Sequence, residues 1–245
     1  MAIGPQRETI TRMPARGAAQ AADIDVGLRA YMQKVFGLMG VGTAITGLVA
    51  FFTSQSPAML EAIFTTPLRW VIFFAPLGFV LALSFGIRRM SAATAQLVFW
   101  LFSGVMGLSL SSIFLVYTQQ SIVTTFFVSS ATFFAMALYG YTTKRDLTSW
   151  GSFLFMGLIG LIIASVVGIF VNSTALQLTI SAVGVLIFTG LTAYDTQMIK
   201  EQYDANYGGE VTGKLAVMGA LTLYLDFINL FQMLLSLLGN RSSNE

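Results

Sequence analysis

Two aspartates, Asp195 and Asp226, are the residues whose positions point most directly to chemistry. The chain has eleven acidic residues, and these two alone lie inside long apolar runs, whereas the others fall in polar tails or loops. A charged side chain near the centre of a membrane helix costs roughly 2.5–3.5 kcal/mol on insertion scales, so such acids usually face the interior of a bundle and mark a function. Two neighbouring carboxylates in a medium of low dielectric constant do not both ionise readily and tend to share one proton. The pair is therefore a candidate proton sensor.

The same two carboxylates are a candidate calcium site. Loss of the shared proton would replace a hydrogen bond by repulsion between like charges and would create an anionic site of hard oxygen ligands, which suits Ca²⁺. The chain contains no histidine and no cysteine, which excludes a histidine pH switch, thiolate or imidazole metal sites and disulfides. We expect protons and calcium, as a permeant or transiently bound ion, to be the species handled here, with no resident cofactor.

Further polar residues flank Asp226. Thr222 and Asn229 lie four residues before and three residues after it, which places all three on one face of a helix. Tyr224 lies between them and is expected to support the pair as well. Asp226 is therefore part of a polar stripe along one face of an otherwise apolar helix.

Asp195 lies closer to the end of its run than Asp226 does. Thr192 shares its face and Tyr194 precedes it, and both are expected to support it. With about 1.5 Å of rise per residue, Asp226 would lie roughly 10 Å deeper in the membrane than Asp195 unless the last helix begins outside the bilayer. Their pairing is therefore a hypothesis. The alternative for Asp195 is a structural role, in which its carboxylate finds its partners at a helix end or faces a loop.

The elements that must position these residues are membrane helices. Hydrophobic residues make up 56% of the chain and charged residues only 10%, with a mean hydropathy of +0.76, whereas soluble domains carry about 25% charge. The continuous apolar runs are about twice as long as a barrel strand. The sequence predicts an all-α membrane protein, a seven-transmembrane-helix bundle over residues 32–240, after a flexible cytoplasmic tail over residues 1–31. The predicted spans are 35–54, 67–87, 92–117, 121–142, 150–171, 176–198 and 215–238.

The basic residues predict the orientation of this bundle. If the N-terminus is cytoplasmic, eleven of the thirteen Lys and Arg residues fall on the cytoplasmic side, and only Arg69 and Arg241 fall outside. Positive charge favours cytoplasmic loops, so the seven spans place the N-terminus inside and the C-terminus outside. Because the basic residues are scattered among loops, no nucleic-acid partner is expected. The compact chain with short loops suggests a bacterial inner membrane.

Small residues recur four positions apart in three of the predicted spans, and this spacing lets helix backbones approach closely. We expect it to serve packing within one subunit, with a dedicated dimer interface as the alternative. The residues are Gly40 and Ala44; Ser103, Gly107 and Ser111; and Gly160, Ala164 and Gly168.

The two aspartates lie in motifs that resemble the paired signature of the Bax inhibitor-1 family, also called the transmembrane Bax inhibitor motif family. The motifs are residues 189–200 (TGLTAYDTQMIK) and 220–231 (ALTLYLDFINLF). The resemblance implies a seven-helix bundle with its last helix near the centre and a pH-sensitive calcium leak whose di-aspartyl sensor falls on Asp195 and Asp226. It also implies an arginine latch from the second helix, for which Arg88 and Arg89 are the candidates. Ordinary positive-inside anchoring is the alternative role for these two arginines.

Three other functions compete with a proton-gated calcium leak. A regulatory membrane protein would bind a membrane protease or a stress or cell-death partner without conducting ions, and its aspartates would be structural. An intramembrane aspartyl protease would use the pair as an acid–base dyad, but Asp226 lacks the flanking glycines of that class, so no enzymatic activity is expected. Proton-coupled transport is disfavoured by the absence of an internal repeat.

Overall fold

The described part of the chain is helical. The computed structural model describes residues 15–171 and 173–242, with side chains from residue 26 onward, and these residues form no strand. The helices are α1 (Ala15–Ser54), α2 (Pro57–Phe64), α3 (Leu68–Gly86), α4 (Ala92–Leu110), α5 (Ile113–Val116), α6 (Gln119–Thr142), α7 (Thr148–Phe170), α8 (Thr174–Glu201) and α9 (Gly209–Leu238). Among the described residues, seven helices are long and apolar enough to cross a membrane, with α4 and α5 counted as one span. The prediction of an all-α chain with seven spans is confirmed.

The first helix begins much earlier than expected. The sequence predicted a flexible tail to residue 31, but α1 begins at Ala15, so residues 15–31 are helical and only residues 1–14 of that tail lie outside the described residues. Alanines recur through residues 15–22, and alanine has the highest helix propensity of all residues. The apolar part that could cross a membrane begins at Val26.

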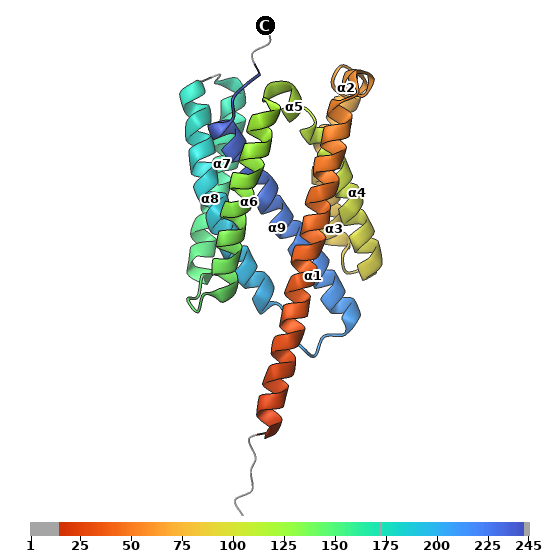
Figure 1. Ribbon diagram of the computed structural model, residues 1–245, viewed down its shortest axis with the longest axis vertical. Helices are drawn as coiled ribbons and strands as arrows, with labels where there is room; N and C mark the ends of the chain where they lie inside the picture. The colour runs from red at the N-terminus through yellow and green to blue at the C-terminus, as the bar shows by residue number, and fades with distance from the viewer. Residues whose placement is uncertain (1–14, 172, 243–245) are drawn as a thin grey trace, which may run out of the picture.

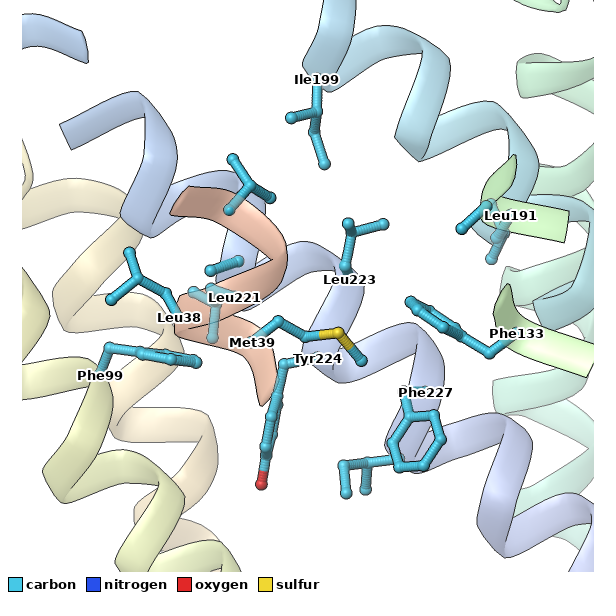
Figure 2. Close-up of a cluster of buried hydrophobic side chains, with 14 of the residues drawn as sticks. Leu38, Met39, Phe99, Phe133, Leu191, Ile199, Leu221, Leu223, Tyr224 and Phe227 are labelled. Carbon is cyan, nitrogen blue, oxygen red and sulfur yellow. The ribbon is translucent and has the colours of Figure 1, made fainter. Parts of the chain in front are cut away.

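The last helix, α9, runs through the middle of the bundle. In its most apolar stretch 56% of the residues are buried, compared with 33% or less in each other span. Figure 1 shows α9 crossing obliquely between the other long helices. Figure 2 shows Leu223, Tyr224 and Phe227 of α9 among Met39, from α1, and Phe133, from α6. The central last helix implied by the family resemblance is therefore present.

Most basic residues of the described helices and loops gather at one end of the bundle, which we call the basic end. It contains the start of α1, the α3–α4, α6–α7 and α8–α9 connections, and Lys34, Arg88, Arg89, Lys144, Arg145, Lys200 and Lys214. Two carboxylates support helix starts there. Oε1 of Glu210 accepts a hydrogen bond from the Ala92 amide at 2.8 Å, at the first residue of α4. Hydrogen bonds from Thr148, at the start of α7, hold the pKa of the Asp146 carboxyl below its usual range.

The opposite end of the bundle is closed by the last described residues. The Thr118 amide donates to the Asn240 carbonyl at 3.1 Å, and the Ser242 amide donates to the Val116 carbonyl at 2.9 Å. The chain after α9 therefore pairs with the segment between α5 and α6, which fixes the end of α9 against its neighbours.

Two glycines allow helix backbones to approach closely. A Cβ atom at Gly107 of α4 would lie 2.7 Å from the Thr46 carbonyl oxygen of α1. A Cβ atom at Gly140 of α6 would meet the Ala193 carbonyl oxygen of α8 at a distance shorter than any real contact. These contacts fix α4 against α1 and α6 against α8, two residues before Asp195.

Candidate functional site

The structure brings the two intramembrane aspartates together. The carboxyl groups of Asp195 of α8 and Asp226 of α9 lie within hydrogen-bonding reach of each other. An ionised carboxylate has no proton to donate, so a hydrogen bond between the two groups requires a proton on one of them. Asp226 is 5% exposed, and its Oδ2 atom has no hydrogen-bond partner among the described residues. The pair is therefore placed to share a proton, and Oδ2 of Asp226 is a further buried oxygen with no partner among the described residues.

The contact between α8 and α9 explains how the pair forms despite the difference in depth expected from the sequence. The helix α9 begins at Gly209, six residues before the span predicted from residue 215, and it crosses the bundle obliquely (Figure 1). An oblique helix uses more residues to reach a given depth, so Asp226 meets Asp195 at one level. Gly219 helps, because a Cβ atom there would lie 2.9 Å from the Ile199 side chain of α8.

The two aspartates line a cavity of about 1000 Å³. Its walls come from α3 and α4 on one side and from α7, α8 and α9 on the other, and they are mainly apolar. Among the described residues α3 packs on α2 and α4 while α7 packs on α8, and α3 and α7 make no extensive contact with each other. Leu77 and Phe155, from α3 and α7, both line the cavity and are more than half exposed. The mouth of the cavity therefore lies between α3 and α7, on the side of the bundle.

Three of the predicted supporting residues lie in this cavity: Tyr194, Thr222 and Asn229. The Thr222 hydroxyl donates to the Met218 carbonyl at 3.2 Å, and the Asn229 amide nitrogen donates to the Leu225 carbonyl at 2.8 Å. Both bonds return to the helix that carries them. This leaves the Asn229 carbonyl oxygen and the lone pairs of the Thr222 hydroxyl as neutral oxygens near the pair.

The other two supporting residues do not lie in the cavity. The Thr192 hydroxyl is buried and donates to the Phe188 carbonyl of its own helix at 2.7 Å. The Tyr224 hydroxyl is hydrogen-bonded to the Thr46 hydroxyl at 2.6 Å, and its ring packs against Phe99 and Phe102 of α4 at centroid distances of 5.7 and 5.3 Å. Figure 2 shows the Tyr224 side chain beside Phe99. The expectation that Tyr224 supports the aspartates is not met, because it joins α9 to α1 and α4 instead.

The candidate latch residues lie away from the aspartates. Arg88 and Arg89 are exposed in the turn after α3, and neither lines the cavity. This arrangement is that of arginines anchored at the end of a span, and a latch role for either one stays a prediction.

Two residues near Asp195 hold α8 in place and were not singled out from the sequence. Oε1 of Gln197 accepts from the Leu147 amide and its Nε2 donates to the Arg145 carbonyl, both at 2.8 Å. The Lys200 ammonium donates to the Tyr141 carbonyl at 2.9 Å. The available signal was the amide side chain of Gln197 inside an apolar helix, since such groups seek partners across helices. The α6–α7 connection is thus tied to the helix that carries Asp195.

The donor set limits what the site can bind. No group of three or more Asp, Glu, His or Cys side chains able to hold a metal ion occurs in the described ranges. Two carboxylates and a few neutral oxygens form a weaker site than the six to eight oxygens that Ca²⁺ prefers. The arrangement suits transient contact with a cation and exchange of a proton.

Comparisons with known proteins cover nearly the whole described chain. The family model described as inhibitor of apoptosis-promoting Bax1 matches residues 28–243. The chain is 49% identical over 217 residues to the protein RP147 of Rickettsia prowazekii, covering 89% of this chain and 92% of that one. It is 48% identical over 219 residues to the inner membrane protein YbhL of Escherichia coli, covering 88% and 93%. A Caulobacter vibrioides protein is 44% identical over 226 residues, covering 88% and 90%.

Proposed function

Since the chain belongs to the Bax inhibitor-1 family, we propose that this membrane protein is a pH-sensitive calcium leak channel in which Asp195 and Asp226 sense protons. The observation that carries the proposal is the close approach of these two carboxyl groups at the wall of a large cavity. The similarity to YbhL favours a bacterial inner membrane. The basic end then faces the cytoplasm, in agreement with the positive-inside rule.

The proton on the pair controls the contact between α8 and α9 in this proposal. With the proton in place, the hydrogen bond holds the two helices together at the cavity wall. When the proton leaves, two negative charges lie side by side in a medium of low dielectric constant, where their repulsion is far stronger than in water. The pair must then separate or take up a cation, so calcium flux rises as pH increases.

The ligands near the pair suit a cation that passes through. Calcium prefers hard oxygen ligands, and the deprotonated pair would supply two carboxylates beside the oxygens of Thr222 and Asn229. A cation that binds too tightly does not leave, and conduction needs sites weak enough to release the ion. An incomplete ligand set is therefore compatible with a leak and would be a defect in a storage site.

Calcium flux into liposomes tests the proposal directly. The purified protein is reconstituted into liposomes loaded with a calcium dye. Flux is then measured from about pH 5.5 to about pH 8.5, a range that extends to both sides of neutrality. We expect flux above protein-free liposomes that increases with pH. Flux that does not depend on pH would contradict the sensor, and no flux at any pH would favour the regulatory function. Cleavage of a membrane substrate by the same preparation would favour the protease, which the proposal excludes.

A further inference from the structure

A seam runs along the bundle between α1 and α6. Among the described residues α1 packs on α2, α4, α5 and α9, and α6 packs on α5, α8 and α9, but α1 and α6 make no extensive contact with each other. We call the space between them, with α9 behind it, the α1–α6 seam. Two cavities open along it, one of about 760 Å³ at the basic end and one of about 320 Å³ toward the opposite end.

The cavity at the basic end can recognise a phosphate. It is lined by Arg29, Gln33, Tyr141 and Lys200, and no acidic side chain is among its described lining residues. The Lys200 ammonium lies 5.5 Å from the Tyr141 ring centroid and donates to the Tyr141 carbonyl. An ammonium has three N–H donors, so two remain for a ligand. Arg29 also lines this cavity and lies exposed at its rim.

The cavity toward the opposite end is apolar. Gly47 and Ala50 of α1 line it together with Val123, Phe126 and Phe127 of α6. Phe127 is 67% exposed, so the wall formed by α6 opens to the hydrocarbon of the bilayer. A hydrocarbon chain fits such a wall, and a charged group does not.

The surface of α1 connects the two cavities. Gln33, Phe36, Gly40, Thr43 and Gly47 follow one another at steps of three or four residues, so they share one face of the helix. A Cβ atom at Gly40 or Gly47 would have no neighbour within 4 Å, and the groove thus stays open where α1 passes from one cavity to the other. The rise from Gln33 to Thr43 is roughly 15 Å, about half of a hydrocarbon core of about 30 Å. This matches the depth of the acyl chains of one leaflet.

We propose that the α1–α6 seam binds an anionic phospholipid from the leaflet at the basic end. Lys200 holds the phosphate, and one acyl chain lies along the α1 face past Gly40 to the apolar cavity. A basic pocket between membrane helices is a known kind of site for anionic headgroups. A second copy of this chain is disfavoured as the occupant, because the basic cavities of two copies would repel each other. The site is separate from the aspartate cavity and does not depend on the function proposed above.

Lipid retention measured by native mass spectrometry tests the assignment. The purified full-length protein in detergent is mixed with phosphatidylglycerol or, separately, with phosphatidylcholine. We expect the wild type to retain one phosphatidylglycerol and to retain phosphatidylcholine about tenfold less. Both lipids carry the phosphate, but phosphatidylcholine also carries a cationic choline group, which the basic side chains at this end repel. Lys200→Gln should lose a similar factor for phosphatidylglycerol. Inorganic phosphate should not displace the lipid, because it lacks the acyl chain.

Two further variants separate the site from general charge and from folding. Lys144→Gln removes one exposed positive charge at the same end but outside the seam, and it should retain lipid as the wild type does. Gly40→Leu fills the groove without changing charge at a position with open space, and it should lose lipid while its thermal unfolding stays close to that of the wild type. Equal retention of both lipids, equal retention by Gly40→Leu and the wild type, or a dimer that Gly40→Leu disrupts would each overturn the proposal.

Discussion

Asp226→Asn is expected to abolish the dependence of calcium flux on pH, so that the ratio of the fluxes at high and low pH falls to about one. Asparagine has nearly the same shape as aspartate, and its amide can donate to the Asp195 carboxylate whatever the pH. The hydrogen bond between α8 and α9 then no longer needs a proton, and the second negative charge cannot form. Asp195→Asn should have the same effect, because either substitution removes the pair of titrating groups.

The double variant and a distant acid provide the controls. Asp195→Asn with Asp226→Asn should change the pH ratio no further than either single variant, since residues that act as one unit are not additive. Glu201→Gln changes an exposed acid at the end of α8 and should keep the pH response of the wild type. A pH response that persists in Asp226→Asn liposomes, measured with the same calcium dye, would remove the pair as the sensor.

Gly140→Ala is expected to cause a large loss of stability, although it adds only one methyl group. The new Cβ atom would meet the backbone carbonyl of Ala193, and a backbone carbonyl cannot rotate away as a side chain can. Overpacking of this kind costs about 1–3 kcal/mol, and occasionally more, in the free energy of unfolding. Thermal unfolding of the purified protein in detergent measures the loss as a lower midpoint temperature.

Gly160→Ala is the matched control for this substitution. Gly160 lies on α7, where a Cβ atom would have no neighbour within 4 Å. Alanine in a helix is about 0.5–1 kcal/mol more favourable than glycine, so the midpoint should stay the same or rise slightly. If both variants unfold at the same temperature, the close approach of α6 and α8 is incorrect.

The sequence predicted the spans well because each apolar run is long and bounded by polar residues. It failed at the first boundary, since the polar residues before Val26 are rich in alanine and continue α1 back to Ala15. It also misjudged the relative depth of Asp195 and Asp226, because counting from span ends treats helices as parallel to the membrane normal. The oblique course of α9 depends on contacts between distant segments, which a single sequence does not reveal.

The residues around the aspartates divide according to helix geometry. Thr222 and Asn229, four residues before and three after Asp226, lie in its cavity as the shared face predicted. Tyr224 is only two residues before Asp226, which is about 200° around the helix, so it faces α1 and α4. The motif placed Tyr224 next to the aspartate in sequence, whereas the helix places it on the other side.

The spacing of small residues predicted only some of the helix contacts. Gly107 of α4 contacts the α1 backbone, as expected for helix packing within one subunit, but Gly160 of α7 and Gly40 of α1 have open space beside them. A helix that faces lipid is apolar on every side, so its sequence carries little signal for which face packs. Only the neighbouring helices distinguish a contact surface from a lipid-facing one.

The width of the mouth of the aspartate cavity can be measured directly. Leu77 of α3 and Ser152 of α7 both line this cavity, one from each side of the mouth, and both are exposed. Because the chain has no cysteine, thiols introduced at these two positions would be the only thiols in the chain to carry spin labels. The distance between the labels would report the width of the mouth in any lipid and at any pH, independently of whether an ion passes.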